Sequence, residues 1–220
     1  MASLIFLLDV DNTLLDNDQV TADLRSYLNA EVGQRRADLY FELFEERRKE
    51  LGYADYLGAL QTYRSCYPRD PHLLAVSSYL INYPFSDRLY PTAMDVLARL
   101  AQVAPTVILS DGDVVFQPLK VQRSGIFAAV DKRVLIYVHK ELELDDVEKR
   151  FPADHYVLID DKLRILTAVK RRWGQRVTSV FVRQGHYADA PEVAQLPAAD
   201  VTIDHIADLL TLDLDTLRSC

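Results

Sequence analysis

The sequence contains five short runs of apolar residues, rich in Val, Ile and Leu, that are separated by longer segments of helical pattern. Each run is continuous and does not alternate with polar residues, which is typical of strands buried on both faces of a parallel sheet. We therefore predict strands at Leu4–Asp9 (LIFLLD), Thr106–Ser110 (TVILS), Val134–Val138 (VLIYV), Tyr156–Asp160 (YVLID) and Val177–Val182 (VTSVFV).

Amphipathic segments fill the intervals between these strands from residue 90 onward. Such alternation requires right-handed crossovers and predicts an α/β fold with a doubly wound, Rossmann-like parallel sheet. A short last strand near Asp200–Ile203, followed by a helix capped by Asp204, is expected to close the chain. The helices between the strands are predicted at Ala93–Gln102, Val114–Gly125, Glu141–Arg150 and Lys162–Trp173.

Residues 14–89 interrupt this alternation, because they carry helical patterns and no convincing strand. We predict an all-helical domain of residues 14–89, inserted into an α/β core domain of residues 1–13 and 90–220. Eight tyrosines fall in the insert, and they either fill a thin helical core or line a ligand cleft. The predicted helices of the insert are Thr21–Glu31, Gln34–Leu51, Tyr53–Cys66 and Pro71–Ile81.

The composition narrows the classes of partner. The chain has 220 residues and a net charge of −8, which argues against a general nucleic-acid binder, since such a protein needs a basic face. Its two cysteines, Cys66 and Cys220, form no metal-binding or disulfide pattern and favour a reducing, cytoplasmic setting. No apolar run approaches the roughly 18 residues of a membrane span, so we expect no membrane partner. The sequence carries no signal for an oligomeric state.

Charged and hydroxyl side chains stand at the ends of four predicted strands. In an open parallel sheet the carboxyl ends of the strands share one edge, where ligands bind, so we expect these groups to meet at one site. Asp9 ends the first strand and is followed by Asp11, and Ser110 ends the second. Lys140 comes just after the third strand, and Asp160 ends the fourth with Asp161 next to it.

This set of groups suits the hydrolysis of a phosphate monoester. Carboxylates from two strand ends can hold Mg²⁺, which prefers oxygen ligands and polarises a phosphoryl oxygen. One carboxylate can attack phosphorus, and a second acid can protonate the leaving alkoxide and later activate water. A serine and a lysine can stabilise charge on the phosphoryl oxygens.

The ordered motifs resemble those of the haloacid dehalogenase-like (HAD) hydrolases, in the helical-cap branch that is similar to phosphoglycolate phosphatase. That family carries D-x-D-x-T, a Ser or Thr at a strand end, a Lys, and a paired acidic motif, in this order. The matching segments are DVDNT at Asp9–Thr13, LSDGD at Leu109–Asp113, HKE around Lys140 and IDDK at Ile159–Lys162.

The resemblance implies a role for each acidic residue and for the threonine. Asp9 would be the nucleophile and a Mg²⁺ ligand. Asp11 would be the general acid/base, with its main-chain carbonyl on the metal, and Thr13 would orient Asp11 and brace the loop. Asp161 would complete the metal site, with Asp160 beside it as a direct or water-mediated ligand.

The resemblance also implies how the substrate is held. The phosphoryl group would be bound by Ser110 and Lys140, with Asp111 and Gly112 beside them. Residues 14–89 would form a mobile cap that closes over a small phosphorylated metabolite and excludes water. Family members that cleave carbon–halogen bonds lack the second acid and the metal, so Asp11 points to phosphoryl transfer.

The chain departs from the family pattern at Asp111, where many relatives have Asn. Its charge would oppose a phosphate group unless the side chain points away or meets a cation. Lys162 is expected at the surface or behind the site. The arginines of residues 34–51 and the five histidines are expected to be solvated or structural, whereas three arginines of the insert could meet an anionic substrate group: Arg64, Arg69 and Arg88.

Two other functions remain open. A phosphomutase or phosphotransferase of the same superfamily would share the whole apparatus and would differ in how its cap excludes water. A non-catalytic binding protein on this scaffold would be expected to lose Asp9, Asp11 or Lys140, and all three are present.

A calcium loop of the EF-hand type starting at Asp9 is excluded, because its turn glycine and bidentate glutamate are missing.

Overall fold

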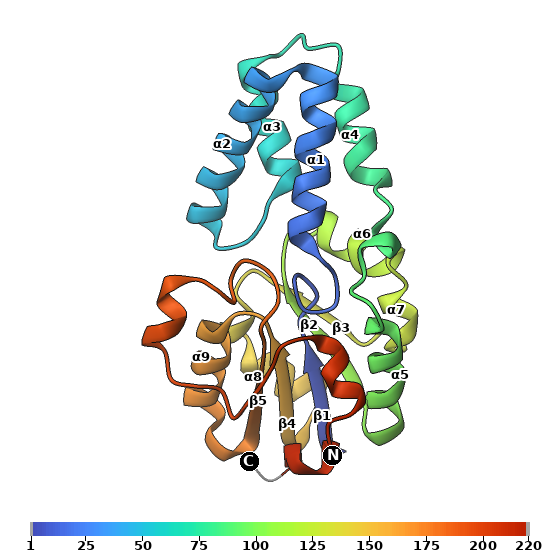
Figure 1. Ribbon diagram of the computed structural model, residues 1–220, viewed down its shortest axis with the longest axis vertical. Helices are drawn as coiled ribbons and strands as arrows, with labels where there is room; N and C mark the ends of the chain where they lie inside the picture. The colour runs from blue at the N-terminus through green and yellow to red at the C-terminus, as the bar shows by residue number, and fades with distance from the viewer. Residues whose placement is uncertain (1, 219–220) are drawn as a thin grey trace.

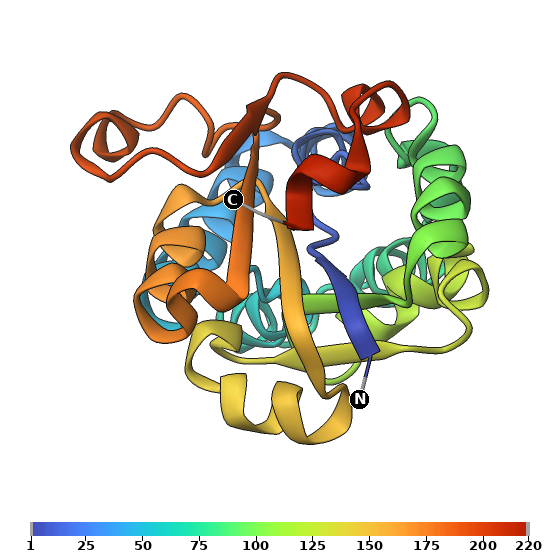
Figure 2. The same cartoon turned by 90° about the horizontal axis from the view of Figure 1, so that it is seen from below.

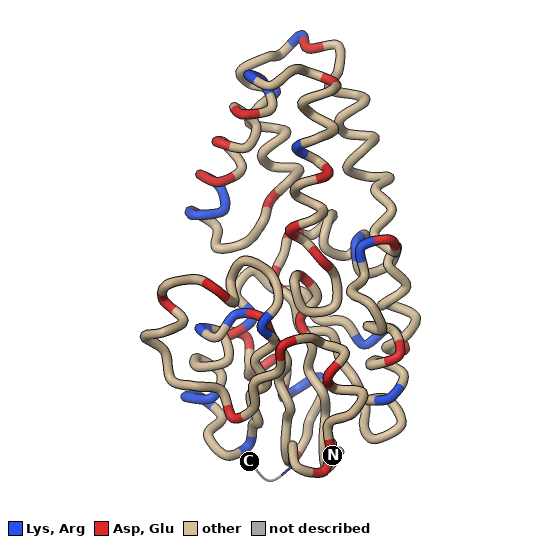
Figure 3. The backbone as a smooth tube through the Cα atoms, viewed as in Figure 1, with Lys and Arg blue, Asp and Glu red and all other residues tan. Residues whose placement is uncertain are grey.

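The structure is a computed structural model that describes residues 2–218. Figure 1 shows an α/β core that carries a bundle of helices above one edge of its sheet. Lys and Arg are interspersed with Asp and Glu along both parts of the molecule (Figure 3). Within residues 2–218, no helix is long and apolar enough to cross a membrane.

The core is built on a six-stranded parallel sheet with the strand order β3-β2-β1-β4-β5-β6, which confirms the predicted doubly wound fold. Leu8 of β1 is level with Ile108 of β2 on one side and with Ile159 of β4 on the other. These three strands therefore end at one edge, at the point where the strand order reverses. The strands are β1 (Ala2–Leu8), β2 (Thr106–Asp111), β3 (Val134–Tyr137), β4 (Ala153–Asp160), β5 (Val177–Val182) and β6 (Val201–Ile203).

The side chains of β1 alternate between two hydrophobic clusters, which explains why this strand is apolar throughout. Leu4, Phe6 and Leu8 belong to one cluster, and Ile5 and Leu7 belong to the other. Figure 2 shows α5 on one side of the sheet and α8 and α9 on the other. The helices of the core are α5 (Ala93–Val103), α6 (Phe116–Arg123), α7 (Ile126–Ala129), α8 (Leu144–Arg150) and α9 (Leu163–Trp173), with short 3-10 turns η2 (Lys140–Leu142), η3 (Gly174–Arg176), η4 (Pro191–Gln195), η5 (Ile206–Leu210) and η6 (Leu214–Arg218).

The helical bundle stands above the carboxyl ends of the strands (Figure 1). Polar side chains fix where two of its helices begin, since Asp16 accepts the Gln19 N–H at 2.8 Å and Asp55 accepts the Gly58 N–H at 2.8 Å. Gly52 ends the second helix with a φ of 81°, a left-handed conformation that glycine adopts without steric cost. The elements are α1 (Asn17–Val32), α2 (Gln34–Leu51), α3 (Tyr56–Cys66), α4 (Leu73–Asn82) and the 3-10 turn η1 (Phe85–Arg88).

The two segments that join the bundle to the core lie side by side. The Asp16 N–H donates to the Arg88 carbonyl at 2.8 Å, and the Tyr90 N–H donates to the Leu14 carbonyl at 2.9 Å. Leu15 also forms a β-bridge with Leu89. The chain thus leaves and re-enters the core at one place, directly above the end of β1.

The last part of the chain differs from the prediction. Asp204 does not cap a helix there. Residues 206–210 form the 3-10 turn η5, and His205 is its N-cap. The Asp208 carboxylate accepts the His205 N–H at 2.9 Å, so the cap depends on a residue inside the turn and not on the acid before it.

Candidate active site

Asp9 follows β1 directly and lies buried at the floor of the site. Its Oδ1 accepts the Ser110 hydroxyl at 3.0 Å and lies 2.7 Å from Lys140 Nζ. Burial alone raises the pKa of Asp9, but the ammonium groups of Lys140 and Lys162, together with the hydrogen bonds from Lys140 and Ser110, outweigh burial and hold that pKa below its ordinary value. The side chain is therefore an ionised carboxylate, and Oδ2 is the oxygen left for a reaction partner.

Lys140 lies at the start of η2 with its side chain buried beneath the cavity floor. Its Nζ donates to the Leu109 carbonyl at 3.1 Å and pairs with Asp160 Oδ2 at 2.7 Å as well as with Asp9. Burial lowers the pKa of Lys140, but Asp160 and Asp9 together raise it above its ordinary value. A fixed positive charge therefore lies between two strand ends.

Three buried carboxylates are close enough to share a cation. Asp9, Asp160 and Asp161 each place one oxygen within 4.8 Å of the others. Both carboxylate oxygens of Asp161 are buried and have no hydrogen-bond partner among the described residues, and burial raises the pKa of both Asp160 and Asp161. These oxygens are unpaired hard ligands, so the cluster fits the Mg²⁺ that the sequence suggests.

Asp11 lies outside this cluster, and its carboxylate is held by α6. Lys120 Nζ donates to Asp11 Oδ1 at 2.6 Å. The hydroxyl of Thr13 is buried and makes no hydrogen bond to a described residue, so the expected orientation of Asp11 by that hydroxyl is not seen. Instead, Gln184 braces the loop by donating to the carbonyls of Asn12 at 3.3 Å and Thr13 at 3.2 Å.

Ser110 and its neighbours differ in what they can offer a phosphoryl group. The Ser110 hydroxyl is fixed by Gln117 Nε2 at 3.0 Å. Asp111 accepts the Lys140 N–H at 2.7 Å through Oδ1, and burial raises the pKa of Asp111 to about 6. The Gly112 N–H already donates to the Tyr137 carbonyl at 2.9 Å, so the expected contact of Gly112 with phosphate does not use that donor.

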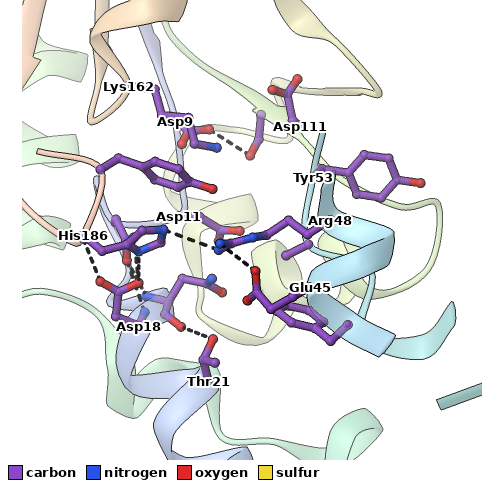
Figure 4. Close-up of a pocket in the computed structure, with 16 residues that line it drawn as sticks. Asp9, Asp11, Asp18, Thr21, Glu45, Arg48, Tyr53, Asp111, Lys162 and His186 are labelled. Carbon is purple, nitrogen blue, oxygen red and sulfur yellow. Dashed lines mark hydrogen bonds and ion pairs between the residues drawn. The ribbon is translucent and has the colours of Figure 1, made fainter. Parts of the chain in front are cut away.

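A cavity of about 320 Å³ opens over these strand ends. Its floor includes Asp9, Asp11, Ser110 and Asp111, and its other walls come from the helical bundle and from the loop after β5 (Figure 4). Those walls are formed by Asn12, Asn17, Asp18, Thr21, Phe44, Glu45, Arg48, Tyr53, Ala54, Lys162, His186 and Tyr187.

Several of these wall residues were not expected in the site. Arg48 was expected on a solvated face, but it lines the cavity, where it pairs with Glu45 at 2.9 Å. His186 was expected to be solvated or structural, yet it lines the same cavity and binds Asp18 through Nδ1 at 2.6 Å. Lys162 also reaches the cavity, with Nζ 4.8 Å from the ring centre of Tyr187. Only the fold reveals them, because no local pattern distinguishes these residues from ordinary surface groups.

The three arginines expected to meet an anionic substrate group do not line this cavity. Arg88 pairs with Asp23 at 2.6 Å, and neither residue lines the cavity. Arg64 is exposed on α3. Tyr53 is the one tyrosine of the bundle among the cavity residues, and Tyr40, Tyr56 and Tyr63 are buried in the hydrophobic core of the bundle.

Comparisons place this fold among solved structures. The chain is 57% identical to a protein described as a haloacid dehalogenase-like hydrolase from Burkholderia xenovorans LB400, over 97% of this chain and 100% of that one, with a TM-score of 0.92. It is 16% identical to the HAD-hydrolase YfnB from Bacillus subtilis, a structure bound to magnesium, over 96% and 98% of the two chains, with a TM-score of 0.65. It is 20% identical to the L-2-haloacid dehalogenase from Xanthobacter autotrophicus, over 96% and 98%, with a TM-score of 0.61. No protein-family model matches the chain, and neither does any curated protein.

Proposed function

The chain belongs to the haloacid dehalogenase-like hydrolases, and on that premise we propose that it hydrolyses phosphate monoesters of small metabolites. The reaction would pass through an aspartyl phosphate on Asp9 and would need Mg²⁺. The observation that carries this proposal is the position of Asp11, a second carboxylate that faces the same cavity as the nucleophile.

Asp9 is prepared for attack on phosphorus. It is ionised, and Ser110 and Lys140 hold its Oδ1 in place, so that Oδ2 can form the new bond. Bound Mg²⁺ would offset the negative charge of the carboxylates and of the phosphoryl oxygens. Asp9, Asp160 and Asp161 would hold that ion.

Asp11 distinguishes the two reactions that this family fold can support. A halide is a very weak base and leaves without a proton, whereas an alkoxide leaves rapidly only when an acid protonates it. A carboxylic acid at Asp11 would therefore serve a phosphate ester and would have no task in dehalogenation. Afterwards the same carboxylate can take a proton from the water that attacks the phosphoenzyme.

Hydrolysis of a carbon–halogen bond is the second candidate. It is favoured by the fold that this chain shares with the L-2-haloacid dehalogenase from Xanthobacter autotrophicus, at 20% identity. It would use Asp9 as the nucleophile toward carbon, and it gives no reason for the buried acidic cluster.

A phosphomutase would use all of the groups named for the phosphatase and would differ in the fate of the phosphoenzyme.

The test is product release by the purified chain. Inorganic phosphate would be measured with a panel of phosphate monoesters and halide with a panel of 2-haloacids, each with Mg²⁺ or with chelator. We expect phosphate release that needs Mg²⁺ and falls to background in Asp9→Asn, with no halide release. Halide release that survives chelation would instead establish the dehalogenase, and phosphate release unaffected by chelator would reject the metal.

A further inference from the structure

We propose that Lys120 is a positioning residue for the general acid Asp11, an inference that rests on the phosphatase proposed above. Lys120 belongs to none of the motifs that carry the family resemblance. It lies on α6, and its ammonium contacts the reaction site through Asp11.

The contacts of Lys120 are few and specific. Its side chain is only 1% exposed, and its Nζ lies 2.6 Å from Asp11 Oδ1 and 2.9 Å from Asn17 Oδ1. The ring centre of Phe116 lies 5.8 Å away. A buried ammonium is costly to desolvate, so a lysine is retained in such a place only where its partners compensate it. Here one of the two partners is the carboxylate that must deliver a proton.

The ion pair determines which oxygen of Asp11 can react. Lys120 occupies Oδ1, so Oδ2 is the atom left to face the leaving group. In the transfer step the bond from Asp9 Oδ2 to phosphorus forms while the bond from phosphorus to the ester oxygen breaks. The proton on Asp11 Oδ2 moves to that oxygen, and the carboxylate that remains on Asp11 faces the ammonium, which stabilises it.

Asn17 connects this arrangement to the helical bundle. Its Oδ1 accepts both Lys120 Nζ at 2.9 Å and the hydroxyl of Tyr56 on α3 at 3.3 Å. The same hydroxyl lies 2.8 Å from the Thr21 hydroxyl on α1. The ammonium is therefore placed by the bundle as well as by the core, and Asp11 is held in position where the two parts meet.

Leaving-group dependence separates a positioning role from a merely structural one. An alkyl phosphate needs a proton on its leaving oxygen, whereas p-nitrophenolate leaves with little need of one. The value of kcat/KM covers the steps up to formation of the phosphoenzyme, so it is not affected by the later attack of water. Both esters would be measured with saturating Mg²⁺ for wild type, Lys120→Met and Lys120→Arg.

A matched control is Lys170→Met, since Lys170 also lies on a core helix and pairs with an aspartate, Asp200, at 2.8 Å, but does not line the cavity. In Lys120→Met we expect kcat/KM to fall by roughly 10²-fold for the alkyl phosphate and by less than about 5-fold for p-nitrophenyl phosphate. Lys120→Arg should recover part of the loss, and Lys170→Met should be unchanged on both esters.

Equal losses of Lys120→Met on both esters, or no loss on either, would overturn the positioning role. If Lys120→Met fails to fold, as judged by thermal unfolding, Asn17→Ala takes its place, because it removes one acceptor of the same ammonium. A smaller loss confined to the alkyl phosphate is then expected, and a uniform loss overturns the inference. Absence of wild-type turnover on both esters would overturn the proposed phosphatase itself, and with it this inference.

Discussion

At the scale of single residues, the site depends on how unlike charges are paired below the cavity floor. Lys140 is shared by Asp9 and Asp160 at 2.7 Å each, and together with Lys162 and the Ser110 hydroxyl it keeps Asp9 ionised although Asp9 is buried. Among the residues that the structure describes, the Asp111 carboxylate has no such ion pair, and the one hydrogen bond that it accepts comes from the Lys140 N–H. Its other oxygen is buried without a partner among the described residues. The two acids, both near one lysine, therefore differ in their tendency to ionise.

Because of its raised pKa, Asp111 lowers the free energy of unfolding by an amount that depends on pH. Its pKa of about 6 in the folded protein lies above the ordinary value of 3.8, so the unfolded chain loses the proton first as pH rises. As pH rises from about 4 to 7, the ionisation of Asp111 therefore lowers the free energy of unfolding. In Asp111→Asn that effect disappears, so the variant should gain roughly 1–3 kcal/mol over wild type at pH 8 and almost nothing at pH 4.

Denaturant unfolding of both proteins at pH 4, 6 and 8 measures this difference. Asn can still accept the Lys140 N–H, so the substitution removes the charge and keeps the hydrogen bond. A difference between the two proteins that stays constant with pH would contradict the assignment of a raised pKa to Asp111.

At the scale of elements, the sequence predicts the strands well and the contacts of the bundle poorly. The run VTSVFV matches β5 at both ends, because its Val, Thr and Phe residues favour strands and all six residues are buried. Gln34–Leu51 likewise matches α2, whose periodic apolar residues and terminal Gly52 are local signals. No local pattern shows which side of α2 meets the cavity, so Arg48 was expected to be a solvated residue. Arg48 enters the site only because the bundle lies over the strand ends.

The same reasoning explains which parts of the candidate site could be foreseen. Each of these groups lies at or just after the carboxyl end of a strand, so topology alone brings them to one edge: Asp9, Asp11, Ser110, Lys140, Asp160 and Asp161. Lys120 and Gln184 act on this edge from elsewhere in the fold, at distances that no spacing in the sequence encodes. The 3-10 turn η5 was expected to be a helix capped by Asp204. The apolar periodicity of so short a segment does not distinguish a 3-10 turn from an α-helix.

At the scale of the whole molecule, the proposed Mg²⁺ site predicts that metal binding and stability are coupled through the buried acidic cluster. Asp161 is fully buried with no hydrogen-bond partner among the described residues, and burial raises its pKa. A raised carboxyl pKa costs stability at neutral pH, and a bound cation would remove that cost.

We expect Mg²⁺ at about 100 times its Kd to stabilise wild type by about 2.7 kcal/mol, which is a rise in Tm of several degrees. Asp161→Asn should lose this response and, without Mg²⁺ at neutral pH, should be more stable than wild type. Asp204→Asn serves as control, since that side chain is 73% exposed and does not belong to the cluster. Scanning calorimetry with Mg²⁺ and with chelator gives both comparisons, and an unchanged Mg²⁺ response in Asp161→Asn would exclude Asp161 as a ligand.

The central claim is that Asp9 carries the phosphoryl group during turnover, and trapping that group tests it most directly. Asp11→Asn would be mixed with p-nitrophenyl phosphate and Mg²⁺ and quenched in acid, and its peptides would be analysed by mass spectrometry. The variant is chosen because this ester can form the phosphoenzyme without a proton donor, whereas loss of the base slows the attack of water. We predict the mass of one phosphoryl group on the peptide that contains Asp9, and none in Asp9→Asn. The account would be contradicted if wild type released p-nitrophenol while neither wild type nor Asp11→Asn carried a phosphoryl group on that peptide.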